Sequence, residues 1–168
     1  YGVDTIDAVL TGRTDFGVVL DFAALTRLGT DKLRIVSSII EPEPGFHKLA
    51  VRKGINGAED LKGKSVGVAE GTLQQYVTLR YLDVNNIPRE EVERVKFSSL
   101  FEIVSAIKAG HIDAGWVWGE GTPKIREMSE AEIITDDSAA KIQSVGYLAG
   151  STEFVNNNPE ATQKVLKT

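Results

Sequence analysis

Residues 70–74, with the sequence Glu-Gly-Thr-Leu-Gln, have the residue types of an anion-binding turn. A strand pattern ends just before this stretch, and a helix pattern begins within it. The first N–H groups of a helix have no partner inside the helix, and the helix dipole favours a negative charge beside them. The turn is therefore a candidate site for an anionic group. Thr72 would equally suit a purely structural role as the cap of its helix.

The two tryptophans, Trp116 and Trp118, belong to a predicted strand at 112–118 and should point to one face of it. A strand tryptophan usually packs in the core, so Trp116 is expected to be at least partly structural. Trp118 ends the strand beside Gly119 and Glu120, where a ligand would lie. Asp21-Phe22 stands at the equivalent end of an earlier strand, at 16–20.

Other site chemistries have little support in the sequence. There is no cysteine, which excludes a disulfide, a thiol nucleophile and a cysteine zinc site. Gly63-Lys64-Ser65 resembles the end of a phosphate-binding loop but precedes its strand instead of following it. Neither His47 nor His111 is expected at the ligand-binding edge, and His111 with Asp113 lacks a third metal ligand. Asp136-Asp137 is expected in a solvated turn. The sequence predicts no cofactor, metal or catalytic residue.

Strand and helix patterns alternate along the chain, which favours parallel α/β sheets with right-handed crossovers. Strands are expected at 16–20, 33–40, 47–53, 65–69, 92–97, 112–118, 132–135 and 145–149. Helices are expected at 4–10, 22–28, 58–61, 73–84, 100–109, 123–128 and 159–166. The apolar stripe of the helix at 73–84 is predicted to be Tyr76, Leu79, Tyr81 and Leu82.

A short pattern occurs twice, 98 positions apart (113 − 15). Aligning 4–20 with 102–118 gives the identities Ala8/Ala106, Gly12/Gly110, Asp15/Asp113, Gly17/Gly115 and Val19/Val117, where chance would give about one. The first glycine permits a left-handed exit from a helix, the aspartate can accept backbone N–H bonds, and the second glycine lets helix and strand approach. Two copies suggest two similar lobes, although any helix-to-strand turn prefers Gly and Asp.

Composition limits the classes of function. The chain has 168 residues, 42% hydrophobic and 26% charged, as expected for a globular protein. Its net charge of −5 argues against nucleic-acid binding. Its apolar runs are far shorter than the roughly 20 residues that span a bilayer.

Several stretches together resemble the substrate-binding proteins of ABC importers, in particular the nitrate/sulfonate/taurine branch. Residues 7–19 and 21–25 resemble the signature of the first lobe, and residues 49–54 resemble the strand that crosses into the second lobe. The opening of the second lobe and its signature are matched at 58–68, 71–72, 106–110 and 113–115. The resemblance covers nearly the whole chain.

The resemblance implies a two-lobe α/β structure, the periplasmic binding protein type II fold, in which each lobe is a mostly parallel sheet flanked by helices. Residues 1–50 and 145–168 would form an incomplete lobe 1 and residues 54–143 lobe 2, with crossing strands at 47–53 and 143–149. Gly119–Pro123 departs from the acidic-Pro-aromatic stretch that is frequent in the family. The chain is expected to be a fragment, because the family's opening strand and closing helices are missing.

The implied function is that of a non-catalytic receptor in the periplasm or on the outer face of the cytoplasmic membrane. It would capture a small anionic or zwitterionic solute by hinge closure and present it to a membrane permease. The alternatives are an enzyme on the same fold, similar to pyrimidine-synthase or menaquinone-pathway relatives, and an effector-sensing domain of a regulator. The residues expected to bind the ligand are Asp21, Phe22, Gly71, Thr72, Leu73, Gln74, Trp118 and Glu120.

Overall fold

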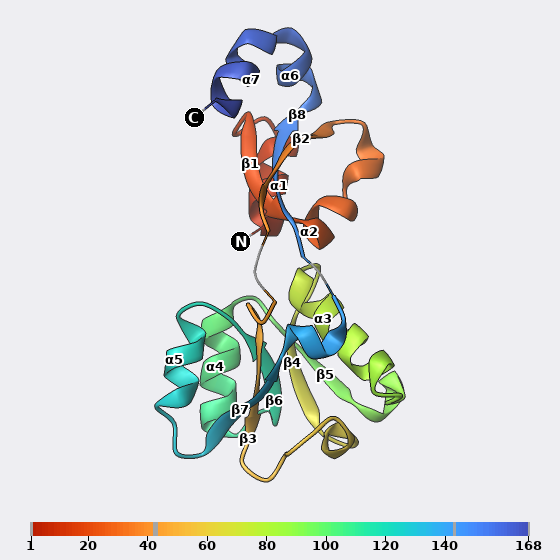
Figure 1. Cartoon of the computed structure of the whole chain (residues 1–168), viewed down its shortest axis with the longest axis vertical. Helices are drawn as coiled ribbons and strands as arrows, with labels where there is room; N and C mark the ends of the chain where they lie inside the picture. The colour runs from red at the N-terminus through yellow and green to blue at the C-terminus, as the bar shows by residue number, and fades with distance from the viewer. Residues whose placement is uncertain (1, 42–43, 143, 168) are drawn as a thin grey trace. The chain divides into compact units, whose positions relative to one another are not determined.

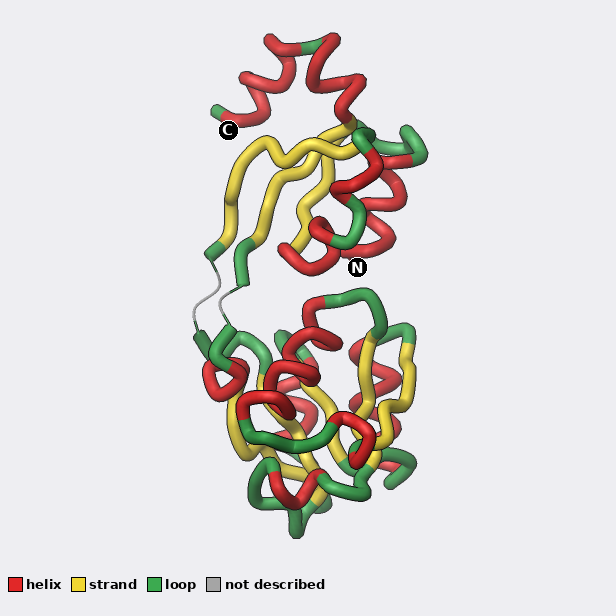
Figure 2. Tube along the Cα trace, turned by 90° about the vertical axis from the view of Figure 1, so that its right-hand side faces the viewer, coloured by secondary structure: helices red, strands yellow, loops and turns green. Residues whose placement is uncertain are grey.

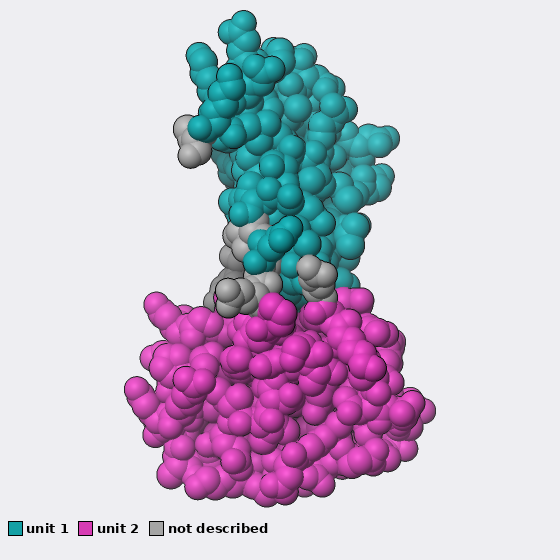
Figure 3. Space-filling model, viewed as in Figure 1, with its two compact units in different colours: residues 1–42, 71–73, 144–168 teal, residues 43–70, 74–143 magenta. Residues whose placement is uncertain are grey.

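The computed structural model describes residues 2–41, 44–142 and 144–167, which fold into two compact units. Unit 1 consists of residues 1–42, 71–73 and 144–168, and unit 2 of residues 43–70 and 74–143 (Figure 3). Each unit has its own sheet, one of three strands and one of five. The two copies of the repeated pattern lie in different units.

Unit 1 is built on a sheet with the strand order β1-β8-β2. Its strands are β1 (Phe16–Leu20), β2 (Leu33–Ile40) and β8 (Gly146–Ser151), and β8 is antiparallel to both neighbours. The helices are α1 (Gly2–Leu10), α2 (Asp21–Leu25), α6 (Thr152–Asn157) and α7 (Pro159–Leu166). Helices α1 and α2 lie on one face of the sheet (Figure 2). The core between them includes Ile6, Val9, Val19, Ala23 and Ala149.

Unit 2 has the strand order β5-β4-β6-β3-β7. Its strands are β3 (Lys48–Arg52), β4 (Ser65–Ala69), β5 (Glu93–Phe97), β6 (Ala114–Val117) and β7 (Ala131–Asp136). Strand β4 is parallel to β5 and β6, whereas β3 is antiparallel to β6 and β7. The carboxyl ends of β4, β5, β6 and β7 therefore meet the start of β3 at one edge, which we call the carboxyl edge.

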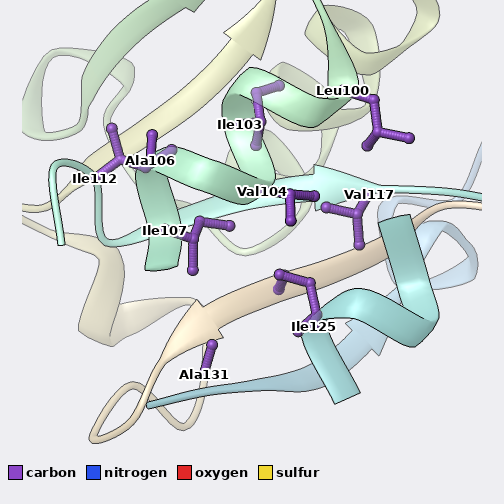
Figure 4. Packing of buried hydrophobic residues seen from close by; sticks show 10 residues of the cluster. Leu100, Ile103, Val104, Ala106, Ile107, Ile112, Val117, Ile125 and Ala131 are labelled. Atoms are coloured by element: carbon purple, nitrogen blue, oxygen red, sulfur yellow. The ribbon is translucent and has the colours of Figure 1, made fainter. Parts of the chain in front are cut away.

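Three longer helices cover the sheet of unit 2: α3 (Leu73–Val84), α4 (Leu100–Ala109) and α5 (Gly121–Arg126). Helices α4 and α5 lie together on one face (Figure 1). Their side chains form a cluster with β6 and β7 that includes Leu100, Ile103, Val104, Ile107, Val117, Ile125 and Ala131 (Figure 4).

Helix α3 begins and ends at the predicted residues, but its apolar face differs from the prediction. The buried side chains include Leu73, Val77, Tyr81 and Leu82, whereas Tyr76 is 38% exposed. The prediction for Tyr76 was wrong because the buried face consists of two adjacent rows of residues four apart, at 73, 77 and 81 and at 74, 78 and 82. The second row includes the polar Gln74 and Thr78, which a search for an apolar stripe passes over.

The first glycine of the repeat ends a helix in both units, as predicted. Gly12 and Gly110 have φ angles of 70° and 72°. The hydrogen bonds around them correspond residue by residue. The Gly12 N–H donates to the Val9 carbonyl and the Gly110 N–H to the Ile107 carbonyl, both at 3.1 Å. The N–H of the following residue, Arg13 or His111, donates to the carbonyl five residues before it, both at 2.9 Å. This pattern closes a helix with a left-handed glycine.

The second glycine of the repeat allows close helix–strand packing, also as predicted. A Cβ atom at Gly17 would lie 2.4 Å from Thr5 Cγ2 of α1, and one at Gly115 would lie 2.6 Å from Ile103 Cγ2 of α4. Contacts this short do not occur between real side chains. The observed distances between α1 and β1 and between α4 and β6 therefore require glycine at these two positions.

Two expectations about organisation need correction or comment. Residues 43–50, expected in lobe 1, belong to unit 2, because β3 pairs with β6 and β7 in the five-stranded sheet. Helix α6 was not predicted; it is short and begins at Thr152, directly after its N-cap Ser151, whose hydroxyl accepts the Phe154 N–H. The expected boundaries at Tyr1, Gln143 and Thr168 lie outside the described residues. None of the helices in the described part of the chain is long and apolar enough to cross a membrane.

Gly115→Ala should lower the free energy of unfolding by about 1–3 kcal/mol, because the added methyl group overlaps Ile103. Urea denaturation measures the change. Gly57→Ala is the control, since no atom lies within 4 Å of the position where its Cβ would stand. Adding Ile103→Ala to Gly115→Ala should cost less than the sum of the two single changes; strict additivity would contradict the proposed contact.

Candidate functional site

The carboxyl edge of unit 2 brings together residues that are distant in the sequence. Strand register pairs Lys48, the first residue of β3, with Val117 at the end of β6 and with Asp136 at the end of β7. Ligands of open α/β sheets bind at the carboxyl ends of the strands. The edge is therefore the candidate site that unit 2 contributes.

Gln74 fixes the geometry of this edge. Its side chain is buried, its Oε1 atom accepts the Ala69 N–H at 2.7 Å, and its Nε2 atom donates to the Trp116 carbonyl. One amide thus joins the ends of β4 and β6. Both ends of the amide are engaged with the backbone, so the Gln74 side chain holds the adjoining turn to the end of β6.

The two tryptophans have different neighbours. Trp116 is 1% exposed and contacts Tyr81 of α3 edge-on, with 5.4 Å between ring centroids. Trp118 is half-buried, packs against the cluster of α4 and α5, and lies 5.5 Å from the His47 ring. Strand β6 ends at Val117, so strand alternation does not fix the direction of Trp118. Trp116 is structural, whereas Trp118 retains an exposed part at the edge.

A buried His47–Asp137 pair lies beside Trp118. The Nδ1 atom of His47 is 3.1 Å from the Asp137 carboxylate, which also accepts the N–H groups of Gly45 (2.6 Å) and His47 (3.0 Å). His47 and Asp137 are 4% and 7% exposed. Two expectations were therefore wrong: His47 does lie at this edge, and Asp137 is buried instead of solvated. The pairing joins residues 90 apart in the chain, so no local pattern indicated it.

The electrostatics of the edge favour ionised carboxylates. Burial alone would raise the pKa of Asp137, but the hydrogen bonds from the His47 side chain and from the N–H groups of His47 and Gly45 outweigh it and lower the pKa. The pKa of Asp136 is also lowered, first by the Ser138 hydroxyl, with help from Lys48, whose Nζ lies 3.3 Å away.

Phe46 was not among the predicted site residues. It is 44% exposed and contacts the His47 ring edge-on at 5.0 Å between centroids. Phe46, His47 and Trp118 thus form a row of rings at the carboxyl edge. The adjacent Phe-His pair just before β3 was the only local indication, and it becomes informative only once β3 is known to pair with β6.

The remaining predicted residues lie in several places. Asp21 and Phe22 begin α2 in unit 1, and the Asp21 carboxylate accepts the N–H groups of Phe22 (2.7 Å) and Val145 (3.3 Å). Gly71 and Thr72 are half-buried between β4 and α3, and Gly71 has a φ angle of 73°. Leu73 is buried at the start of α3, and Glu120 is exposed just before α5.

Metal chemistry has no arranged ligand set in the part of the chain that is described: no three His, Cys, Asp or Glu side chains are grouped so that they could hold an ion. The site offers aromatic surface and a buried imidazole–carboxylate pair. These groups suit the recognition of a small solute.

Comparison with solved structures defines the class of fold. The periplasmic aliphatic sulphonate binding protein SsuA of Escherichia coli matches with a TM-score of 0.81 and 20% identity, over 99% of this chain and 57% of that one. The alkanesulfonate-binding protein SsuA of Xanthomonas axonopodis pv. citri, bound to MOPS, matches with a TM-score of 0.84 at the same identity and coverage. The fold is therefore that of the periplasmic binding proteins.

The chain belongs to the NMT1/THI5-like family, whose profile matches residues 2–168. A curated relative from Brucella abortus (strain 2308), named as a binding protein, is 28% identical over 167 residues. The match covers 96% of this chain and 50% of the relative, so the chain spans about half the length of the curated relatives it matches.

Gln74→Met should destabilise the protein, because it leaves the Ala69 N–H and the Trp116 carbonyl without their partner in a buried place. Each unsatisfied group costs about 1–3 kcal/mol. Urea denaturation measures the loss. Gln163→Met, at an exposed position of α7, should change the free energy of unfolding by less than about 0.5 kcal/mol. Equal effects of the two variants would contradict the role given to the Gln74 amide.

Asp137→Asn should lower the free energy of unfolding at neutral pH by about 1–3 kcal/mol, because the amide cannot accept all three hydrogen bonds. The pKa of Asp137 is lower in the folded chain than the unfolded value of about 3.9. Its stabilising effect is thus complete above that value and is lost as the pH falls through the folded pKa. The difference between wild type and variant should therefore narrow below about pH 4. Denaturation from pH 7 to pH 3 tests this, with exposed Asp15→Asn as the control; a gap independent of pH would refute it.

Proposed function

We propose that this chain is part of a non-catalytic solute receptor of an ABC importer. The receptor binds a small, anionic solute between two lobes, closes on it by hinge motion and presents it to a membrane permease outside the cytoplasm. The family match and the fold shared with periplasmic binding proteins support this proposal. The observation that carries it is the carboxyl edge, where the turn from β4 to α3 meets the end of β6.

The turn at 71–73 is the proposed contact with the anionic group. Gly71 takes a left-handed conformation that leads from β4 into α3. The first N–H groups of α3 and the helix dipole would stabilise a negative charge, and the Thr72 hydroxyl would add a donor. The Gln74 side chain links this turn to β6, because it bonds to the Ala69 N–H and to the Trp116 carbonyl. Asp21, Phe22 and Glu120 complete the proposed ligand contacts.

The row of rings indicates the remaining part of the solute. Trp118 and Phe46 offer partly exposed aromatic surface at the carboxyl edge. A solute with an anionic head and an apolar or planar remainder would use both features. The two SsuA proteins are named for sulfonate ligands, and a sulfonate has this chemistry. Taurine is a small zwitterionic sulfonate, whereas nitrate is a bare oxyanion that would use the anion-binding turn alone.

One observation favours the alternative of an enzyme on the same fold: an imidazole bonded to a carboxylate is the arrangement of a general base. The His47 ring is only 4% exposed and lies between the rings of Phe46 and Trp118, which favours a structural role. A receptor should return its ligand chemically unchanged. Mass spectrometry of ligand released from the full-length protein, before and after long incubation, distinguishes the two functions, and an altered mass would establish the enzyme.

Thr72→Asp should weaken binding of the anionic solute by at least about 100-fold, because like charges at a recognition site cost several kcal/mol. Thr72→Asn is the matched control. Asparagine has the same size as aspartate and is also a good helix cap, but it adds no charge. Calorimetry on the full-length protein, with the solute identified by mass spectrometry, measures both affinities. Quenching of Trp118 fluorescence should report binding in the parent protein and in the control variant.

Affinities of the Asp and Asn variants that both equal that of the parent protein would contradict the anion site and leave Thr72 as a helix cap. Equal losses in both would show that the hydroxyl matters and the charge does not. That result would also contradict an anionic ligand at this turn.

A further inference from the structure

The opposite edge of the unit 2 sheet carries a polar cavity of about 380 Å³. We call it the basic cavity, because the charged residues that line it are Arg52, Lys53 and Lys64, with Asp60 and Asp113. It lies where β3 ends and where β4 and β6 begin. Strand β4 separates it from the carboxyl edge by roughly 16 Å, given a rise of about 3.3 Å per residue. The cavity is therefore distinct from the proposed solute site.

The cations of the basic cavity are anchored through their backbones. The Arg52 N–H donates to the Asp113 carbonyl at 2.8 Å, and the Lys53 N–H donates to the Glu130 carbonyl at 3.0 Å. The Lys64 N–H donates to Leu61, and its carbonyl accepts the Glu93 N–H, both at 3.0 Å. The points from which the three side chains project are thus held in place by the sheet and its adjoining turns.

The Arg52 guanidinium has a defined position. A Cβ atom at Gly110 would lie 3.0 Å from one terminal nitrogen of Arg52 and 3.2 Å from Cζ, so the guanidinium packs over the glycine that ends α4. The carbonyl end of a helix favours a cation, which helps to hold the group there. The planar guanidinium can offer two parallel N–H donors to an oxyanion.

The two acids of the basic cavity accept hydrogen bonds from neighbouring neutral groups. Asp113 Oδ2 accepts the Ser65 N–H (2.9 Å) and hydroxyl (3.0 Å). Asp60 Oδ2 accepts the Asn56 N–H at 2.8 Å. Nearby Lys62 is paired with Glu59 at 2.7 Å. Among the described residues, no ion pair within 4.0 Å includes Arg52, Lys53 or Lys64.

The basic cavity thus combines three cations with two acids, an excess of one positive charge (3 − 2), in a chain whose net charge is −5. Like charges held near one another repel, and a bound anion with several acceptor oxygens would remove this cost. We propose that the basic cavity binds a free tetrahedral oxyanion of the phosphate or sulfate type. Arg52 supplies a two-pronged contact, and Lys53 and Lys64 supply charge. This site is independent of the proposed receptor function.

Titration of the full chain with inorganic phosphate, followed by amide NMR, tests the site. The signals of Gly54, Asn56 and Gly63, which lie in the turns beside the cations, should shift and saturate. Sodium chloride at matched ionic strength should not reproduce the shifts. Signals at the carboxyl edge should stay unchanged, which separates this site from the proposed solute site.

The double variant Arg52→Gln/Lys64→Gln should bind phosphate at least about tenfold more weakly. The control, Lys62→Gln/Lys96→Gln, removes the same charge from two lysines that are paired with Glu59 and Glu70. It should bind within about twofold of wild type. An equal loss in both variants, or non-saturating shifts in the wild type, would show general charge screening and overturn the proposal.

Discussion

Close packing of a helix over a strand glycine is the constraint on which both units depend. In each unit a helix ends at a left-handed glycine, the chain turns, and the next strand places a second glycine under that same helix. A side chain at Gly17 or Gly115 would overlap its helix. The close spacing between helix and sheet at these two positions requires glycine. The repeat in the sequence is therefore a repeat of one packing solution in two different sheets.

Once the layers are set, the carboxyl edge of unit 2 is organised by polar side chains that bond to the backbone. Gln74 joins β4 to β6, and Asp137 joins the start of β3 to the end of β7. Buried polar groups of this kind specify one arrangement, because breaking any one bond leaves an unsatisfied partner. Two of the rings at this edge, Phe46 and Trp118, keep an exposed part. A preorganised backbone with aromatic neighbours suits recognition of a solute.

The two ends of the same sheet use charge differently. At the carboxyl edge, Lys48 is paired with Asp136 and Asp137 with His47. At the amino end of β4, the Asp113 carboxylate accepts hydrogen bonds from the Ser65 N–H and hydroxyl. Among the described residues, the three cations of the basic cavity form no ion pair within 4.0 Å. The aspartate of the repeat thus anchors its strand in unit 2, as the sequence suggested. In unit 1, exposed Asp15 instead bonds through its carbonyl, which accepts the Ser151 N–H.

The sequence by itself determined the alternation of elements, the bounds of β1, β2, β4, α3 and α4, and the roles of Gly12, Gly17, Gly110 and Gly115, because strand patterns, helix ends and glycine turns are local properties. The resemblance added the fold class. Only the tertiary structure decided that β3 belongs to the five-stranded sheet, that Gln74 turns to the backbone, and that His47 meets Asp137. Each of these depends on which strands become neighbours. The local sequence around Gln74 or His47 does not indicate its partner, because Trp116 and Asp137 lie 42 and 90 positions further along the chain.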